Sequence, residues 1–174
     1  VGAVYSANPR RVKLAQKIPK ISYQEMGVLA SLGARIIHPN AVETAKKHAI
    51  EIHILSPDNA MNIEQGTIIG KVSSDNPVVG ITYYPHDANS INISMVGQKI
   101  SKMDKADILS LLQQNKILAE IVDTSFSPFS ITVKVNWLEQ LDRCLIVLHT
   151  FFGLDANKPV IINSNNPFDP AIPE

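Results

Sequence analysis

Hydrophobic positions recur over residues 22–32 with the spacing of an amphipathic helix. Ser22 can cap the start of this helix, because Glu25 lies three residues later and completes a capping box. Gly33 follows the last apolar turn, where a residue with positive φ is favoured. The pattern therefore predicts a helix with both ends marked. It also leaves Arg35 as a single cation in the turn before the next helix.

The rest of the first half predicts short strands and one further helix. Residues 1–5 form an apolar stretch that predicts a strand. A second helix is expected from Pro39 to about His48, since proline is tolerated in a first helical turn. Residues 51–54 alternate as a strand, and the GlnGlyThrIleIleGly stretch at 65–70 predicts a turn into another short strand.

A polar, proline-ended stretch at residues 71–77 separates this half from one in which strand and helix patterns alternate. Strands are predicted at 78–84, 91–96, 117–123 and 129–135, and helices at about 104–115 and 137–152. Asn136 can cap the last helix, with Glu139 three residues further on. A sheet covered on one face by two helices is the ferredoxin-like plan.

Composition narrows the class of protein. Hydrophobic residues make up 45% of the 174 residues and charged residues 18%, which is typical of a globular protein. Lys+Arg and Asp+Glu both number 16, so there is no net field to attract nucleic acid or an anionic membrane. The sequence contains no membrane-spanning apolar run or targeting segment. A single cysteine, Cys144, excludes an internal disulfide and favours a reducing, cytoplasmic location.

Motifs that carry chemistry by themselves are absent from the sequence. The 5 histidines lack the spacing of metal ligands, and no nucleophile elbow, glycine-rich phosphate loop or carboxylate pair is present. We therefore predict no metal site and no catalytic residue within the chain. Composition and pattern alone indicate an α/β protein in two parts.

Four segments of the first half follow one another in the order and spacing of a known family. They are Val4-Tyr5-Ser6-Ala7-Asn8-Pro9-Arg10, Ile21-Ser22-Tyr23-Gln24-Glu25-Met26, Ala30-Ser31-Leu32-Gly33-Ala34-Arg35-Ile36-Ile37-His38-Pro39 and Gly66-Thr67-Ile68-Ile69. They resemble the end of the kinase domain of aspartokinases. The second half resembles the ACT regulatory module of those enzymes over ValGlyGlnLysIle, AspThrSer and LeuHisThrPhePhe.

This resemblance implies a fold for each part of the chain. Residues 1–74 would be the C-terminal piece of an α/β amino-acid-kinase domain, in its nucleotide-binding lobe. Residues 75–155 would be a ferredoxin-like α+β ACT domain. Residues 156–174, which have little periodicity, are expected to form an extended or disordered tail.

The resemblance also implies a function. Aspartokinases transfer a phosphoryl group from ATP, with Mg²⁺, to L-aspartate at the start of lysine, threonine and methionine synthesis. This chain would be a C-terminal fragment that lacks the N-terminal kinase half. We expect such a fragment to be inactive alone and not to bind ATP tightly, because nothing would position aspartate or the transferred group.

Residue by residue, the resemblance assigns Tyr5 to the adenine or ribose, and Arg10 and Arg35 to the phosphates. Arg35 stands where the family has lysine, and a guanidinium can also grip phosphate oxygens. The alternatives without a binding role are a packing aromatic for Tyr5 and a solvated cation for Arg35. Asn8 and Gly2 stand where the family has aspartate.

Val28 is a further departure, because the family has a second glutamate there. Together with Gly2, Asn8 and Arg35 it indicates a site that is either tuned differently or weakened.

In the ACT part, the resemblance implies a small amino acid, lysine or threonine, bound at a homodimer interface. The expected contacts lie in two loops, at Gly97, Gln98 and Lys99 and at Asp123, Thr124 and Ser125. A module kept for dimerisation alone is the alternative for this part. For the whole chain, the alternative is a non-catalytic regulatory or scaffolding subunit.

Overall fold

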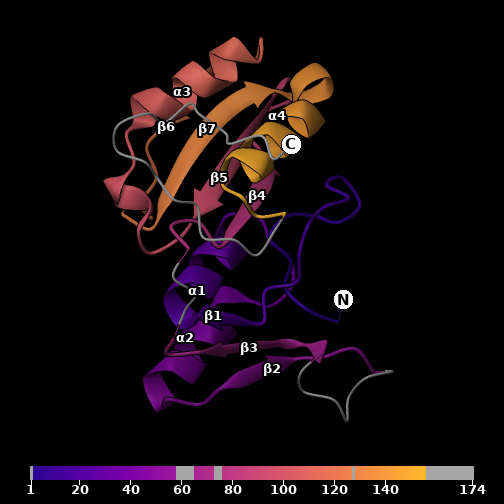
Figure 1. Ribbon diagram of the computed structural model, residues 1–174. Coiled ribbons are helices and arrows are strands. Elements are labelled where there is room, and N and C mark those ends of the chain that lie inside the picture. Colours follow the sequence, from indigo (N-terminus) through magenta and orange to yellow (C-terminus); the bar gives the residue numbers. More distant parts are fainter. Residues whose placement is uncertain (1, 58–64, 73–75, 127, 156–174) are drawn as a thin grey trace, which may run out of the picture.

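The computed structural model describes residues 2–57, 65–72, 76–126 and 128–155, so the predicted tail at 156–174 lies outside the described residues. Figure 1 shows a four-stranded sheet with two helices lying above a smaller sheet with two more helices. The elements in chain order are β1 (Lys20–Ser22), α1 (Tyr23–Ser31), α2 (Pro39–His48), β2 (Ile52–Ile54), β3 (Thr67–Gly70), β4 (Gly80–Pro85), β5 (Ser90–Val96), η3 (Ile100–Lys102), α3 (Lys105–Gln114), β6 (Ala119–Val122), β7 (Ser130–Asn136) and α4 (Trp137–Phe151).

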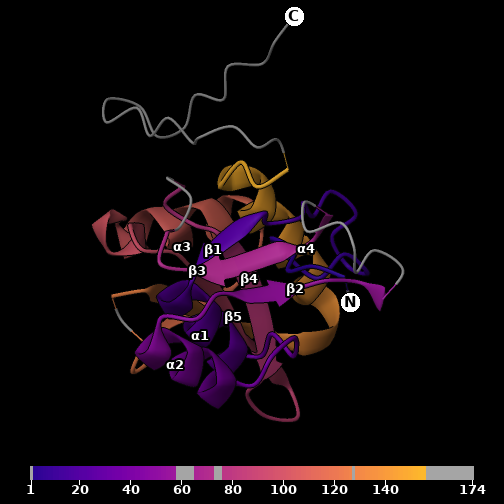
Figure 2. The same ribbon diagram turned by 90° about the horizontal axis from the view of Figure 1, so that it is seen from below.

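The smaller sheet has the strand order β1-β3-β2, with β1 parallel and β2 antiparallel to β3. Seen from below, α1 and α2 lie to one side of these strands (Figure 2). The capping box of α1 is confirmed. The Glu25 backbone N–H donates to Ser22 Oγ over 3.2 Å, and the Ser22 backbone N–H donates to Glu25 Oε2 over 3.1 Å. Gly33 has the expected positive φ, at 115°.

The predicted opening strand at residues 1–5 is wrong over its described residues. This segment forms only an isolated bridge between Tyr5 and Lys17, because the backbone N–H of Val4 donates instead to the side chain of Thr67, over 2.8 Å. The strand that pairs with β3 in parallel is β1, which the sequence pattern did not predict. Three residues directly after a proline are too few to show an alternation.

The larger sheet is antiparallel with the strand order β4-β5-β7-β6. Helices α3 and α4 pack on the face that carries Ile93 and Val133, so the predicted ferredoxin-like plan is confirmed. The extra strand, β4, forms the edge beside β5. Asn136 occupies the N-cap position of α4, but its side chain makes no capping hydrogen bond, so its predicted capping role is wrong.

Each of the two cores contains residues from both parts of the chain. Val12 of the N-terminal segment packs in the core of the larger sheet, whereas Val79 and Val96 pack in the core of the smaller one. The backbone N–H of Ile81 donates to the Ser6 carbonyl over 2.7 Å, which holds the N-terminal segment along β4. Within the described part of the chain, no helix is long and apolar enough to cross a membrane.

Candidate functional site

A cavity of about 580 Å³ lies where the N-terminal segment, the turn after α1 and strand β4 meet. Among its lining residues are Tyr5, Arg10 and Arg35, the three residues that the sequence assigned to a nucleotide. The structure therefore brings these three residues to one cavity. Their role there stays a prediction.

Each of the three side chains is positioned by a local backbone feature. Tyr5 is half-buried at its bridge to Lys17. Arg10 is exposed, and its backbone N–H donates to Asn8 Oδ1 over 3.0 Å, which tightens the turn that carries it. Arg35 is exposed and follows Gly33 by two residues.

Gly33 sets how closely the Arg35 turn approaches β4. A Cβ atom on Gly33 would lie 2.5 Å from the carbonyl oxygen of Tyr83, and its φ of 115° is also unfavourable for other residues. Only glycine therefore allows the end of α1 to pack against the backbone of β4. This contact closes one side of the cavity.

Strand β4 supplies the wall that the sequence did not predict, at Ile81, Thr82, Tyr83 and Pro85. The hydroxyl oxygen of Tyr83 accepts a hydrogen bond from Asn8 Nδ2 and another from Arg11 Nε, each over 3.0 Å. Arg11 also donates to Asp142 over 2.6 Å, and this bond, followed by the bond to Tyr83, raises the pKa of the guanidinium. No pattern in the sequence could indicate these contacts, since they join residues about 70 and 130 positions apart.

The departures from the family pattern have physical explanations. Val28 is buried in the core of the smaller sheet, where a glutamate would be desolvated. A Cβ atom on Gly2 would lie 2.8 Å from Cβ of Ser56, so an aspartate does not fit there without a shift. Asn8 uses both ends of its amide, as acceptor from Arg10 and as donor to Tyr83.

The two loops expected to bind an effector lie at the same end of the larger sheet. Val96 at the end of β5 pairs with Ser130, and Val122 at the end of β6 pairs with Thr132. Gly97 is buried, with its N–H donating to the Phe129 carbonyl over 3.0 Å, and a Cβ there would lie 2.0 Å from the Pro77 carbonyl oxygen.

Most side chains of these loops are accessible. Gln98, Lys99, Asp123 and Ser125 are exposed, whereas Thr124 is partly buried. Asp123 pairs with Lys105 over 3.2 Å, and Thr124 Oγ1 lies 3.3 Å from Ser130 Oγ. The loops therefore flank the start of β7 from either side, and whether they hold a ligand stays a prediction.

The first of these loops is tied to α1 by a buried carboxylate that the sequence did not assign to any contact beyond its own helix. The backbone N–H of Gln98 donates to Glu25 Oε1 over 3.3 Å. Glu25 is fully buried, and its other oxygen accepts from the backbone and hydroxyl of Ser22. One carboxylate therefore joins the start of α1 to the Gly97–Gln98 loop.

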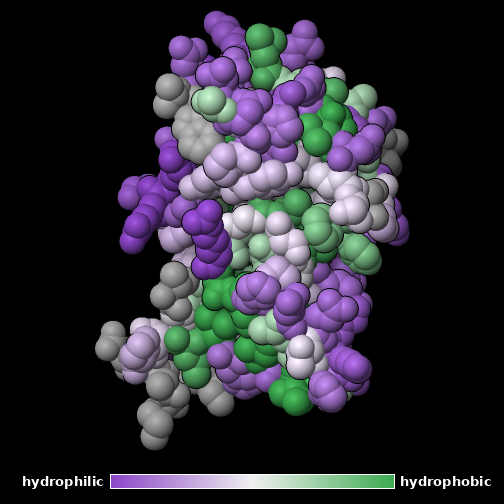
Figure 3. All heavy atoms as spheres, turned by 180° about the vertical axis from the view of Figure 1, so that it is seen from behind, coloured by the Kyte–Doolittle hydropathy of each residue, from purple (hydrophilic) through white to green (hydrophobic). Residues whose placement is uncertain are grey.

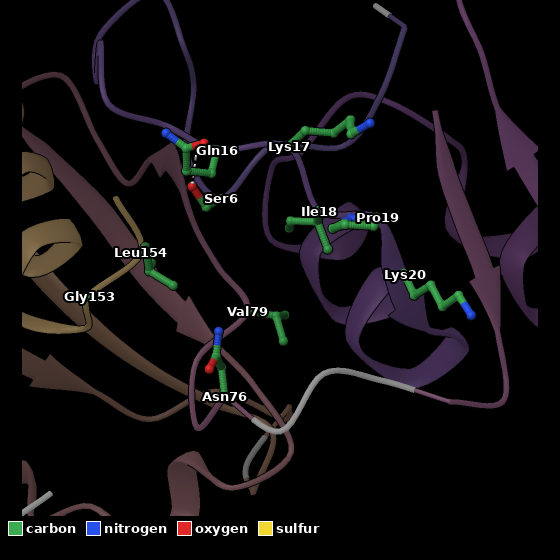
Figure 4. Close-up of a pocket in the computed structure, with 10 residues that line it drawn as sticks. All are labelled: Ser6, Gln16, Lys17, Ile18, Pro19, Lys20, Asn76, Val79, Gly153 and Leu154. Atoms are coloured by element: carbon green, nitrogen blue, oxygen red, sulfur yellow. Dashed lines mark hydrogen bonds between the residues drawn. The ribbon is translucent and has the colours of Figure 1, made fainter. Parts of the chain in front are cut away.

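A second, smaller cavity of about 290 Å³ lies between the N-terminal segment and the chain after α4 (Figure 4). Beside it, Ser6 Oγ accepts from the Gln16 backbone and lies 2.8 Å from Nε2 of the buried His149. Burial lowers the pKa of His149, and the nearby Asp155 opposes this shift. The ammonium ends of Lys17 and Lys20 point away from Leu154 (Figure 4). The lining of this cavity is mainly apolar.

Potential metal ligands and the single thiol are dispersed or buried among the described residues. No group of three or more potential metal ligands is present among the residues that were placed. Cys144 is buried in the larger core, and this burial raises the pKa of its thiol to about 12. The thiol therefore stays protonated and is an inert packing group.

Known proteins match this chain over most of its length. Residues 1–56 match the model of the amino acid kinase family. An aspartokinase from Bacillus sp. (strain MGA3) is 32% identical over 145 residues, which cover 80% of this chain and 34% of that relative. An aspartokinase from Geobacillus stearothermophilus is 30% identical over 160 residues, which cover 90% of this chain and 38% of that relative.

A solved structure, the aspartate kinase of Clostridium acetobutylicum, matches with a TM-score of 0.72 over 86% of this chain and 52% of that one. At 16% identity, this likeness shows a common fold. The matches to the two Bacillus and Geobacillus aspartokinases show that the chain spans about a third of the length of these curated relatives.

Proposed function

The chain belongs to the aspartokinase family, and we propose that it is the C-terminal part of such an enzyme. Residues 1–74 are the end of the nucleotide-binding lobe, and residues 75–155 are an ACT regulatory domain. The parent enzyme transfers the γ-phosphoryl group of ATP, with Mg²⁺, to the β-carboxylate of L-aspartate.

The observation that carries this proposal is the cavity of about 580 Å³ lined by Tyr5, Arg10 and Arg35. Its volume lies in the range of roughly 300–1,000 Å³ that is usual for small-molecule sites. An aromatic ring beside two permanently charged guanidinium groups suits a ligand with a base at one end and phosphates at the other. Tyr5 therefore contacts the adenosine, and the two arginines contact the phosphates.

These residues bind a nucleotide without completing the reaction. Phosphoryl transfer needs groups that align the acceptor carboxylate with the γ-phosphorus and hold the metal ion. We assign such groups to an N-terminal kinase half of the parent enzyme, and the match of this chain to only 34% and 38% of two aspartokinases leaves room for it. The 174-residue chain alone is therefore inactive and binds ATP weakly.

The ACT part senses an amino acid, lysine or threonine, at Gly97–Lys99 and Asp123–Ser125, across a homodimer interface. Support comes from the position of both loops at one end of the sheet and from the Glu25–Gln98 hydrogen bond. A ligand that moves the Gly97–Lys99 loop changes what the carboxylate of Glu25 can hold. Feedback inhibition then acts by favouring one arrangement of the two parts.

A titration followed by amide NMR tests the nucleotide site, because this method detects millimolar affinities. ADP and Mg·ATP are added to the wild-type chain and to Arg10→Ala and Arg35→Ala. Each substitution is expected to weaken binding about 10-fold, since hydrogen bonds to charged groups contribute roughly 1.5–3 kcal/mol. Lys13→Ala is the control, because Lys13 is an exposed cation of the same segment that does not line the cavity.

Two results would overturn the proposal: no perturbation by nucleotide at saturating concentration, or equal weakening by Lys13→Ala. Aspartate phosphorylation by the purified chain would overturn its predicted inactivity. Calorimetry with lysine and threonine separates the sensor from its alternative. Amino-acid binding without nucleotide binding would favour a non-catalytic regulatory subunit.

A further inference from the structure

The hydroxyl group of Tyr83 has an unusual set of partners. Its oxygen accepts from Asn8 Nδ2 and from Arg11 Nε, each over 3.0 Å. A phenolic hydroxyl is both an acceptor and an O–H donor. Because the Tyr83 oxygen accepts from Asn8 and from Arg11, its O–H group is directed at neither of them.

Neither of the two hydrogen bonds can be reversed to use that proton. Arg11 has only donors, and its guanidinium stays protonated. The amide of Asn8 is oriented by its other end, because Oδ1 accepts from the Arg10 backbone N–H over 3.0 Å. Rotating this amide would let the Tyr83 hydroxyl donate to Oδ1, but it would also place two donors together, Nδ2 of Asn8 and the backbone N–H of Arg10, and so lose the Arg10 hydrogen bond.

Tyr83 is also held firmly in its place. Arg11 lies with its guanidinium carbon 5.5 Å from the centre of the Tyr83 ring and bonds Asp142 of α4. The backbone of Tyr83 touches Gly33 on its other side. Tyr83 is therefore fixed in the lining of the 580 Å³ cavity, which Arg10 and Arg35 also line.

We propose that the O–H group of Tyr83 donates a hydrogen bond to a phosphate oxygen of the nucleotide in this cavity. Phosphate oxygens are acceptors only, and the cavity already carries the two guanidinium groups that would attract them. This inference rests on the proposed nucleotide function. It adds a binding residue that comes from the regulatory part of the chain.

A nucleotide bound in this way touches both parts of the chain at once. Arg10 and Arg35 belong to the first part, whereas Tyr83 belongs to the edge strand of the second. Nucleotide binding then stabilises the arrangement in which β4 lies against the end of α1. A ligand that moves β4 away therefore lowers the affinity for nucleotide. By linkage, bound nucleotide lowers the affinity for that ligand by the same factor.

The substitution Tyr83→Phe tests the assignment, with Tyr84→Phe as a matched control. Tyr84 is the next residue of the same strand and points to the opposite face, where its hydroxyl accepts from Asn92 over 2.9 Å. It does not line the cavity. Affinities for ADP and for adenosine are measured by NMR on all three proteins, after thermal melting has shown that each is folded.

Tyr83→Phe is expected to weaken ADP about 10-fold, the usual effect of losing a hydrogen bond to a charged group. It should leave adenosine binding unchanged, because the lost contact is to phosphate. Tyr84→Phe should change neither. Equal weakening of ADP and adenosine by Tyr83→Phe would assign the residue a packing role and overturn the proposal.

The outcomes also distinguish this inference from the proposed function. If Arg35→Ala weakens ADP and Tyr83→Phe does not, the nucleotide site stands and the role of Tyr83 is wrong. If the wild-type chain binds no nucleotide at all, the proposed function fails and this assignment fails with it.

Discussion

The two parts of the chain differ in how completely each is held together by its own residues. In the larger sheet, β5 and β7 pair over seven residues, from Ser90 opposite Asn136 to Val96 opposite Ser130. In the smaller sheet, β3 pairs with each neighbour over only three residues. The core of the smaller sheet also takes in Val79 and Val96, which belong to the second part.

The surface of the first part shows the same incompleteness. An apolar groove lies between α2 and β2, where Ile50 is 60% exposed and Ile52 is half-buried. Figure 3 shows hydrophobic residues gathered on the lower half of the molecule when it is seen from behind. The second part therefore has the more extensive sheet and core, to which the first part adds Val12, whereas the shorter sheet of the first part depends on Val79 and Val96. This difference leads to predictions of unequal effects.

The largest effect is expected from matched substitutions in the two cores, Ile93→Ala in the second part and Ile69→Ala in the first. Both side chains are fully buried, so each loss should cost about 2–5 kcal/mol of unfolding free energy. Ile93→Ala should reduce hydrogen-exchange protection in both parts, because the first part packs on the second. Ile69→Ala should reduce it in α1 and leave α3 protected.

Hydrogen exchange resolved by residue measures both variants. If Ile69→Ala reduces the protection of α3 as much as Ile93→Ala does, the two parts unfold together. The first part would then not depend on the second in the way described above.

An intermediate effect is expected from Glu25→Ala, which removes the carboxylate that joins the two parts. The buried backbone N–H of Ser22 would lose its acceptor, at about 1–3 kcal/mol, and the partly buried N–H of Gln98 would lose its acceptor at a smaller cost because water can reach it. Urea unfolding measures the loss of stability. The amide resonance of Gln98 reports whether the loop is released.

Ser22→Ala is the control for this variant, since it removes the cap and leaves the Gln98 bond in place. It should cost about 1 kcal/mol, the usual effect of losing a capping side chain. If Ser22→Ala also shifts the Gln98 amide to the same extent, Glu25 has no separate role in joining the loop to α1.

The smallest effect concerns pH and the contact between Ser6 and His149. Burial lowers the folded-state pKa of His149 below its ordinary value of 6.5. The unfolded chain then takes up a proton near pH 6.5 while the folded chain does not. Stability is therefore fully present above pH 6.5 and falls as the pH drops from there toward the lower folded-state pKa.

Urea unfolding between about pH 7 and pH 5 measures this slope. His149→Gln should flatten it, because the titrating ring is removed while a polar end group remains. His86→Gln, at an exposed position, should keep the wild-type slope. An unchanged slope in His149→Gln would show that the histidine is not the group responsible.

Much of the fold could be predicted from local patterns. The capped helix α1, the helix α2 and the strands of the larger sheet each carry a periodicity that physical chemistry links to one structure. The short strand β1 and the bridge at Tyr5 could not be predicted this way. Strand β1 pairs with β3, from Lys20 opposite Ile68 to Ser22 opposite Gly70, and Tyr5 pairs with Lys17, and no local pattern encodes such distant pairings.

The candidate site likewise contains residues that the sequence could indicate and residues that it could not. Tyr5, Arg10 and Arg35 could be singled out because their spacing resembles a family motif, and the cavity does bring them together. Tyr83 could not be singled out, since it sits in a strand whose pattern indicates only burial. The link from Glu25 to Gln98 was equally hidden, because a capping box already accounts for that glutamate.

Local sequence patterns therefore indicate the secondary structure of most elements and the family motif of the first part, since both depend on residues close together in the chain. Which side chains share a cavity, and which loop a buried carboxylate joins to α1, follow only from the tertiary structure. The physical reason is that these contacts depend on how the two sheets pack against each other. That packing places Tyr83 within hydrogen-bond distance of Asn8 and Arg11, although it lies more than 70 positions after both in the sequence.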